Sequence, residues 1–307
     1  MSVAPRAVLV HRRTEYEELL ERHGTRGQAA FFLSTRGRDL EEVQARHAAQ
    51  QEAMAAVTAA IPLEWRRGLV ERADLPRFLF DPEDIVVIVG QDGLVANVAK
   101  YLQGQVVIGF NPDPSRNPGI LVPHRAAAAS ELLEVVTSPE LGRRIEARTM
   151  VEGVLDDGQR LCALNELYIG HPSHQTARYA ISLPDGTSEH QASSGLLAAT
   201  GTGATGWCRS AWLERHSTLK LPACTALDLA WFVREAWPSP ATSVRLTEGL
   251  LTRGAELAIT IESDRLVTFG DGIETDAVPL TWVRRSKCGL PGGSCGFSSE
   301  LLGDDDT

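Results

Sequence analysis

The sequence has few cysteines, no long apolar run and no excess of positive charge. Its five cysteines are odd in number, and no pair has zinc-finger spacing, which argues against a disulfide framework or a structural zinc site. No run of apolar residues approaches the length of a membrane span, and the first 13 residues, MSVAPRAVLVHRR, lack the apolar stretch of a signal peptide. We therefore expect a cytoplasmic protein that does not enter a membrane.

Negative charge predominates. The chain has 30 Lys and Arg against 40 Asp and Glu, so its formal net charge is −10. Such a protein is a poor general binder of nucleic acid, although backbone amides can still hold a small anionic ligand. With 43% hydrophobic residues among 307, the chain can build one large or two medium domains.

Strands alternate with helices over the first 110 residues, a pattern typical of βαβ units and of a Rossmann-like parallel sheet. The helix after Thr14 has a capping residue, and Pro62 stops the longest helix. We predict strands at residues 7–10, 29–33, 85–89 and 106–110, and helices at 15–22, 39–60, 65–73 and 94–102.

The pattern changes after the Pro- and Asn-rich loop NPDPSRNPG at residues 111–119. One more helix is predicted at 124–136, and beyond residue 145 most segments read as short strands, with further helices near 207–215 and 225–235. We therefore predict an α/β domain (1–120), a β-rich, sandwich-like domain (121–286) and a mobile, Gly/Ser-rich and then acidic tail (287–307).

Residues 85–102, IVVIVGQDGLVANVAKYL, place an aspartate between a buried strand and a helix. The strand is apolar throughout, which indicates cover on both faces. Ligands of open α/β sheets bind at the carboxyl ends of such strands. Asp92 is therefore a candidate functional residue, and the alternative is that it only caps the following helix.

Two later stretches could bind a nucleotide. Asn165 and Glu166 interrupt an apolar run, and an adjacent amide and carboxylate can hold the hydroxyl groups of a ribose. The alternative is a strand end with two exposed polar residues. The segment TGTGATGW at 200–207 is rich in small residues that let a ligand approach the backbone, and Trp207 offers an aromatic face. The alternative is a flexible turn.

In this order, the stretches resemble the motifs of the NAD kinase family. Gly90-Gln91-Asp92-Gly93 is similar to its GGDG turn, Gly109-Phe110-Asn111 to its GxN element, and Asn165-Glu166 to its Asn-Glu pair. The segments Ser194-Gly195-Leu196 and 200–207 resemble its DGL and T-P-T-G-S-T-A-Y segments. The loop at 111–119 and the sequence SSGL at 193–196 further resemble the mitochondrial-type and plant NADH kinase branch.

The resemblance implies an α/β domain, a β-rich domain and transfer of the γ-phosphoryl group of ATP, or of polyphosphate, to the adenosine ribose 2′-hydroxyl of NAD or NADH. It implies Mg²⁺ accompanying ATP, no metal site of the protein's own, and a homodimer or homotetramer. Asp92 would be the base, with Gly90, Gln91 and Gly93 near the phosphates. The dinucleotide would be held by Asn165, Glu166, Thr200, Thr202, Thr205, Gly206, Trp207 and Ser210.

The chain also departs from the family pattern. Gln91 replaces a glycine, and Leu94 stands where the family has threonine, so a backbone freedom and a hydroxyl are lost. Two alternatives therefore remain: a dinucleotide-binding homologue without ATP turnover or with another donor, and a kinase for a lipid or sugar hydroxyl.

Four further polar residues are weaker candidates. His171 and His174 could suggest a metal, but Pro172 disfavours the helix that would align them. We interpret His124 as a residue that starts a helix and Arg116 as an ordinary exposed arginine.

Overall fold

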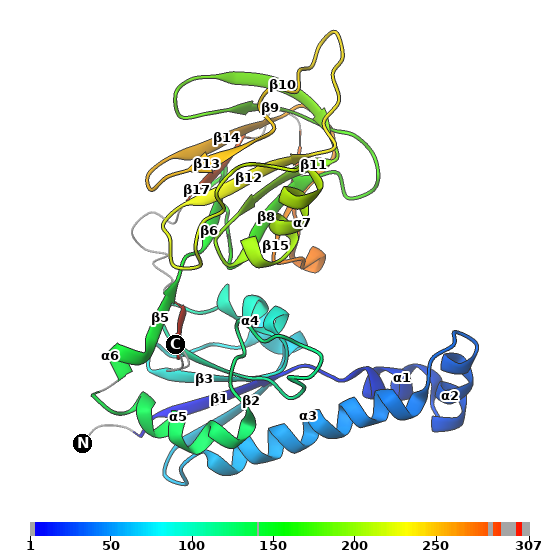
Figure 1. Cartoon of the computed structure of the whole chain (residues 1–307), viewed down its shortest axis with the longest axis vertical. Coiled ribbons are helices and arrows are strands. Elements are labelled where there is room, and N and C mark those ends of the chain that lie inside the picture. Colours follow the sequence, from blue (N-terminus) through cyan, green and yellow to red (C-terminus); the bar gives the residue numbers. More distant parts are fainter. Residues whose placement is uncertain (1–3, 140, 282–284, 290–298, 303–307) are drawn as a thin grey trace. The chain divides into compact units, whose positions relative to one another are not determined.

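The computed structural model describes residues 4–139, 141–281, 285–289 and 299–302. Its backbone divides into an N-terminal unit, Met1–Glu146 with Ser299–Thr307, and a C-terminal unit, Ala147–Ser298 (Figure 1). The composition of the sequence had placed a boundary near residues 111–125. Helix α5 (Ala129–Val136) stays with the first unit because its apolar side chains share a core with the strands of the N-terminal sheet.

The N-terminal unit is built around a six-stranded sheet in the order β2-β1-β3-β4-β18-β5. Strands β2, β1, β3 and β4 pair in parallel, as the alternation of strands and helices predicted. All six residues of β3 are buried, which explains the unbroken apolar run that follows its first residue, Asp84. The strands are β1 (Arg6–His11), β2 (Arg66–Glu71), β3 (Asp84–Val89), β4 (Val106–Phe110), β5 (Ile145–Arg148) and β18 (Ser299–Leu302).

Helices surround this sheet and extend beyond it. The long helix α3 begins after its N-cap Asp39, and α1 begins with a complete capping box at Thr14 and Glu17. The helices are α1 (Glu15–His23), α2 (Arg26–Ser34), α3 (Leu40–Ala60), α4 (Asp92–Ala99), α5 and α6 (Leu141–Arg144), with short 3₁₀ turns η1 (Arg72–Arg77) and η2 (Ala126–Ala128).

Two of the predictions for the N-terminal unit are wrong. Residues 29–33 belong to helix α2 rather than to a strand, because Thr25 caps this helix and Ala29 and Leu33 form its buried face. Residues 66–71 form the edge strand β2 rather than a helix, since they pair with β1 from Arg6 to His11. Both segments are short, and over so few residues sequence periodicity does not separate strand from helix.

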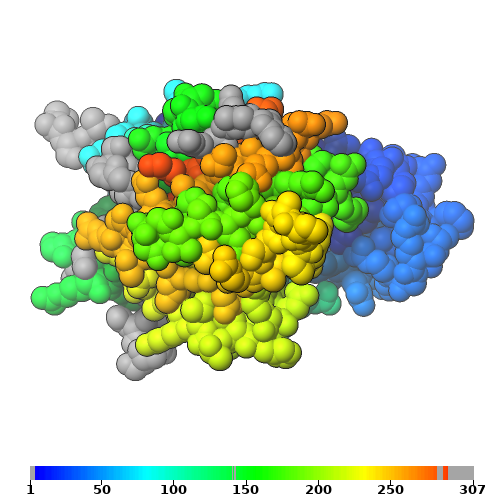
Figure 2. Space-filling view, turned by 90° about the horizontal axis from the view of Figure 1, so that it is seen from above, coloured from blue at the N-terminus to red at the C-terminus, as the bar shows by residue number. Residues whose placement is uncertain are grey.

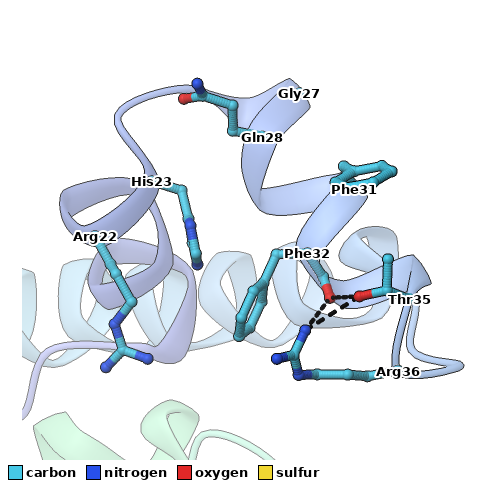
Figure 3. Close-up of a pocket in the computed structure, with 8 residues that line it drawn as sticks. All are labelled: Arg22, His23, Gly27, Gln28, Phe31, Phe32, Thr35 and Arg36. Atoms are coloured by element: carbon cyan, nitrogen blue, oxygen red, sulfur yellow. Dashed lines mark hydrogen bonds between the residues drawn. The ribbon is translucent and has the colours of Figure 1, made fainter.

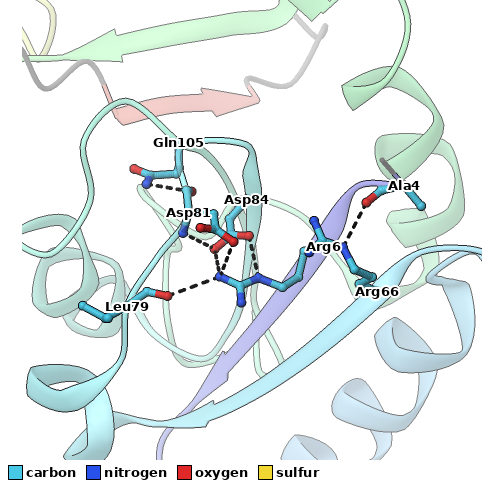
Figure 4. A network of polar contacts seen from close by, with 7 residues as sticks. All are labelled: Ala4, Arg6, Arg66, Leu79, Asp81, Asp84 and Gln105. Carbon is cyan, nitrogen blue, oxygen red and sulfur yellow. Dashed lines mark hydrogen bonds and ion pairs between the residues drawn. The ribbon is translucent and has the colours of Figure 1, made fainter. Parts of the chain in front are cut away.

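A polar network fixes the start of β3 against the start of β1 (Figure 4). Arg6 donates to both carboxylate oxygens of Asp84, at 2.7 and 2.6 Å, and to the carbonyl oxygen of Leu79. The Asp84 side chain is 1% exposed and also accepts the backbone N–H of Asp81. Because Arg6 and Asp84 are register partners, this ion pair fixes the alignment of the two strands.

The C-terminal unit is a sandwich of two antiparallel sheets, as the sequence predicted. Their orders are β10-β9-β14-β17-β6-β7 and β13-β12-β11-β8-β15-β16. Apolar side chains of both sheets, among them Tyr179 and Trp231, form one buried core. In Figure 2 the sandwich strands are coloured green to orange, and the segment after β11 forms the yellow-green margin of the molecule.

The strands of this unit are short and are joined mostly by tight turns. One prediction fails here, because residues 229–234 form the fully paired strand β12 instead of a helix. The strands are β6 (Val151–Leu155), β7 (Arg160–Ala163), β8 (Glu166–Gly170), β9 (Ala177–Ser182), β10 (Ser188–Ser193), β11 (Gly195–Ala199), β12 (Leu229–Arg234), β13 (Glu248–Leu251), β14 (Glu256–Ile261), β15 (Leu266–Gly270), β16 (Val278–Leu280) and β17 (Arg285–Gly289). Helix α7 (Trp207–Glu214) and the turns η3 (Gly203–Thr205) and η4 (Glu274–Asp276) complete the unit.

The tail predicted as mobile contributes two strands. Residues 287–289 belong to β17, which pairs with β14 and β6, and residues 299–302 form β18 beside β4. Residues 290–298 and 303–307 lie outside the described residues.

Candidate functional site

Asp92 is the first residue of α4, directly beyond the carboxyl end of β3. Its carboxylate accepts three backbone N–H groups, those of Ile120 (3.1 Å), Leu121 (2.8 Å) and Val122 (3.2 Å). The N-cap of α4 is Gln91, so the alternative that Asp92 only caps the helix is wrong. Asp92 instead holds the segment that follows the 111–119 loop.

Two glycines allow that segment to approach so closely. A Cβ at position 109 would overlap the carbonyl oxygen of Leu121, and one at position 119 would lie 2.6 Å from the carbonyl oxygen of Val122. Gly119 also has a positive φ of 74°, which disfavours other residues. The three amides can therefore meet Asp92 only because both positions lack a side chain.

The other residues of the predicted phosphate turn are open to a ligand. Gln91 and Gly93 are exposed, and nothing lies within 4 Å of a Cβ built on Gly93. Gln91 has φ −106° and ψ 164°, an ordinary extended conformation, so a glycine is not required at this position for backbone reasons. Leu94 is 5% exposed and offers no polar group.

The 111–119 loop is ordered by its own side chains. Asn111 accepts from the backbone N–H of Asp113 and donates to the carbonyl oxygen of Asn117. Arg116 lies 3.9 Å from the carboxylate of Asp113, so it has a local partner. His124 is 4% exposed and pairs with Phe110 in a β-bridge two residues before η2, so it lies before the helix instead of starting it.

In the C-terminal unit, the Asn165-Glu166 pair stands at the start of β8. Glu166 is 6% exposed, so the alternative of two exposed polar residues is wrong for it. Its carboxyl makes no hydrogen bond with any residue in the described part of the chain. Burial and, to a smaller extent, the nearby negative charge of Asp271 together raise the pKa of Glu166 to about 8.

Thr200 joins this pair to the predicted glycine-rich segment. Its backbone N–H donates to the carbonyl oxygen of Asn165 at 2.9 Å, and its hydroxyl donates to that of Leu164 at 2.6 Å. The same hydroxyl accepts the N–H groups of Thr202 and Gly203. A Cβ at position 203 would overlap the carbonyl oxygen of Asn165, so this glycine is required by packing.

The hydroxyl groups of Thr202 and Thr205 differ in whether they have a hydrogen-bond partner. Thr205 donates to the carbonyl oxygen of Thr202. The hydroxyl of Thr202 is buried and has no hydrogen-bond partner among the described residues. A buried polar group without a partner is costly, and it is often explained by a ligand or a water molecule.

Trp207 and Ser210 line a cavity of about 310 Å³ on the side of α7. The Trp207 ring stacks on Tyr168, with centroids 5.5 Å apart, and the Arg234 guanidinium lies 5.3 Å from its centroid. Part of the indole surface predicted to receive a base is therefore already in contact with protein side chains. Gly206 precedes α7, and a Cβ there would meet only the carbonyl oxygen of Gly203, at 3.8 Å.

A second hollow, of about 600 Å³, lies on the hairpin of α1 and α2 and contains none of the predicted residues (Figure 3). His23 faces the ring of Phe32 at 4.4 Å, and Arg36 stacks on the same ring at 3.8 Å. Because Arg36 also donates to the carbonyl oxygen of Phe32, its charge is partly satisfied within α2.

Two further features would have pointed to other functions, a cluster of metal ligands and a membrane span. Within the ranges that the structure describes, no group of three or more His, Cys, Asp or Glu side chains could hold a metal ion. Over the same ranges, no helix combines the length and the apolar character needed to cross a membrane.

The structure thus brings Asn165, Glu166, Thr200 and Thr202 into one hydrogen-bonded region of the C-terminal unit, and it presents Asp92 in the N-terminal unit. Sequence reasoning missed Asp271, whose carboxylate accepts the N–H groups of Leu164 and Asn165. The Asp-Gly turn at 271–272, directly after a strand, was a signal that could have drawn attention to it.

Comparison with known proteins gives a structural match only. No family model matches the sequence, and no curated protein matches it either. The solved structures that share the fold include the crystal structure of an NAD kinase from Archaeoglobus fulgidus in complex with ATP, with a TM-score of 0.60 and 15% sequence identity. The match covers 98% of this chain and 94% of that one, so the chain has the two-part fold of an NAD kinase.

Proposed function

We propose that this protein is an NAD(H) kinase, which transfers the γ-phosphoryl group of ATP to the 2′-hydroxyl of the adenosine ribose of NAD or NADH. The observation that carries the proposal is the carboxylate of Asp92 at the end of β3, held in place by three backbone amides. The shared fold supports it.

Asp92 has the geometry of a base that orients a hydroxyl. A carboxylate offers about four acceptor positions, and the three amides use three of them. The position that remains is on Oδ2, which accepts only the N–H of Ile120. A substrate hydroxyl that donates there would have its oxygen oriented for attack on the γ-phosphorus and could pass its proton to Asp92.

The C-terminal unit would hold the dinucleotide. The hydroxyl of Thr202 is buried without a hydrogen-bond partner within the described ranges, and Glu166 nearby is only 6% exposed. Ribose hydroxyls and amide groups could bind to both of these polar groups. The neighbouring members of the predicted set, Asn165, Thr205, Gly206, Trp207 and Ser210, would complete the pocket.

Mg²⁺ would be held mainly by the phosphates of ATP. This ion keeps several water ligands and typically uses one or two carboxylates with substrate phosphates. Bound there, Mg²⁺ would neutralise charge on the transferred group. The proposal also includes polyphosphate as an alternative phosphate donor and assembly into a homo-oligomer. It further includes a cytoplasmic location and membership of the NADH kinase branch.

The test measures NADP(H) formed from ATP, Mg²⁺ and either NAD or NADH. We expect product from the wild type and a loss of 10²- to 10⁴-fold in kcat for Asp92→Asn. Asp74→Asn, an exposed carboxylate in η1, is the matched control and should retain full activity. The proposal would be refuted if neither NAD nor NADH were phosphorylated, with ATP or with polyphosphate as the donor.

A second candidate is a dinucleotide-binding protein that does not turn over ATP. It is favoured by Gln91, whose side chain is exposed beside the phosphate turn, and by the apolar Leu94 in the first turn of α4. NAD or NADP at a hundredfold excess over Kd should then stabilise the protein by about 2.7 kcal/mol, and Mg-ATP should not. A lipid or sugar kinase, in contrast, should be stabilised by Mg-ATP and not by NAD.

A further inference from the structure

Asp271 lies in the turn directly after β15 and contacts three consecutive residues of the predicted ribose-binding segment. Its Oδ2 accepts the N–H of Leu164 at 3.1 Å, and its Oδ1 accepts the N–H of Asn165 at 2.7 Å. Its own backbone N–H donates to the carbonyl oxygen of Glu166 at 3.0 Å. The backbone of Asp271 has φ 54°, in the left-handed region that Asp and Asn tolerate better than most residues.

We propose that Asp271 is the positioning residue of the ribose site: its carboxylate and its backbone amide together fix the orientation of the Asn165-Glu166 pair and set the charge that Glu166 presents to the ligand. This inference rests on the proposed function, since it assumes that the pair binds a dinucleotide. Asp271 itself need not touch the ligand.

The positioning extends from Asp271 to the glycine-rich segment. The carbonyl groups of Leu164 and Asn165 receive the hydroxyl and the N–H of Thr200, and the Thr200 hydroxyl receives the N–H groups of Thr202 and Gly203. A rotation of the peptide between Leu164 and Asn165 would therefore disturb both predicted binding segments. The carboxylate of Asp271 opposes that rotation through the N–H of Asn165, and it holds the preceding peptide through the N–H of Leu164.

Asp271 also acts on Glu166 through its charge. The titratable groups that interact with Glu166 in the described part of the chain are Asp271, from the turn after β15, and Cys208, from α7. Burial and, to a smaller extent, Glu166 together raise the pKa of the Cys208 thiol to about 12, so this thiol stays neutral. Among the described residues, the negative neighbour that acts on Glu166 is then Asp271, which favours the protonated form.

The protonation state decides what Glu166 can do with a ribose. A protonated carboxyl both donates and accepts a hydrogen bond, whereas a carboxylate only accepts. Near neutral pH the buried carboxyl can therefore donate to one ribose oxygen and accept from another. Above its pKa this donation is lost, so we expect dinucleotide binding to weaken as the pH rises.

The test compares Asp271→Asn with the wild type. Asparagine tolerates the same φ and keeps one acceptor oxygen, but it removes the charge and places an amide against one of the two N–H groups. Asp185→Asn is the matched control, because Asp185 lies in a turn of the same unit and accepts the N–H of Thr187 at 2.8 Å. Binding of NAD is measured by calorimetry from pH 6 to pH 9.

We expect Asp271→Asn to raise Kd at least about tenfold at pH 7, and Asp185→Asn to leave it unchanged. We also expect the pH at which binding weakens to move down, because the opposing charge is gone. A purely structural role would raise Kd without moving that midpoint. Carboxyl carbon NMR of the ligand-free protein, assigned with Glu166→Gln, should show the same downward movement.

The outcomes separate this inference from the proposed function. If the wild type binds none of NAD, NADH and NADP, the proposed function fails, and the ribose site with it. If the wild type binds but Asp271→Asn has the same Kd and the same midpoint, only the role of Asp271 is overturned. If Asp271→Asn does not fold, hydrogen exchange in the wild type decides: saturating NAD should slow the Leu164 and Asn165 amides, and unchanged exchange there would overturn the inference.

Discussion

The buried carboxyl of Glu166 makes the stability of this protein depend on pH in a predictable direction. The pKa of Glu166 is about 8 in the folded chain against an ordinary value of 4.5, so between these values the folded state binds more protons than the unfolded state. The contribution of this group is fully present below pH 4.5, and it is lost as the pH rises through about 8. At about 1.4 kcal/mol per pH unit, the full interval corresponds to at most about 5 kcal/mol.

The perturbation that isolates this effect is Glu166→Gln, which keeps the size and polarity of the side chain and removes the titration. The free energy of unfolding would be measured by urea denaturation from pH 5 to pH 9. Tryptophan fluorescence is the probe, because every tryptophan except Trp65 lies in the C-terminal unit. We expect the variant to gain stability relative to the wild type as the pH rises, by several kcal/mol at pH 8.

The matched control is Glu256→Gln, which changes an exposed glutamate on β14 of the same unit. The difference in the free energy of unfolding between this variant and the wild type should vary little over this pH range. If Glu166→Gln also gave a difference independent of pH, Glu166 would be ionised in the folded protein, and the argument from burial would be refuted.

Three further predictions concern the N-terminal unit. Arg6→Met leaves the carboxylate of Asp84, which is 1% exposed, without its charge partner, so it should lower the free energy of unfolding in urea by about 3–5 kcal/mol. The control Arg12→Met, which breaks an exposed ion pair, should change this free energy by less than about 1 kcal/mol. Gly109→Ala should lower the free energy of unfolding by about 1–3 kcal/mol, because its Cβ displaces Leu121 from Asp92. It should also lower the kinase activity expected from the proposed function. A variant with full stability and full activity would contradict this prediction. Gln91→Gly should change the free energy of unfolding by no more than about 1 kcal/mol. It should lower the KM for ATP and leave the KM for NAD unaltered. An unchanged KM for ATP would show that Gln91 does not hinder binding of the phosphate donor.

The fold class could be predicted because its elements carry strong local patterns. Residues 85–89 of β3 are an unbroken apolar run, and α3 is a long segment with a capping aspartate and a terminating proline. The errors fell on short segments, α2, β2 and β12, whose state depends on which neighbours they meet. The sequence of β12, LAWFVR, became a strand because it pairs with β11 and β13, which is information that no local window contains.

The candidate site could be predicted as a set of segments, but its internal connections could not. Asp92 was found from its place after a strand, yet its partners lie 28–30 residues later in the chain. Asp271 lies more than 100 residues from Leu164 and Asn165, so their hydrogen bonds arise only when β15 pairs with β8. Residue type and spacing predict which groups can bind a ligand, and tertiary pairing decides which groups orient them.

The strand β18 has a consequence for how the protein is made. Residues 300 and 301 pair with Val106 and Val107, so the N-terminal sheet gains this strand only after nearly 200 intervening residues have been synthesised. The C-terminal unit, by contrast, is a continuous segment. A ribosome-bound chain can therefore complete the sandwich first, while the nascent α/β sheet still has an open edge at β4. During that interval β4 is a site where a second nascent chain could pair wrongly, and slow translation of the last codons would prolong the risk.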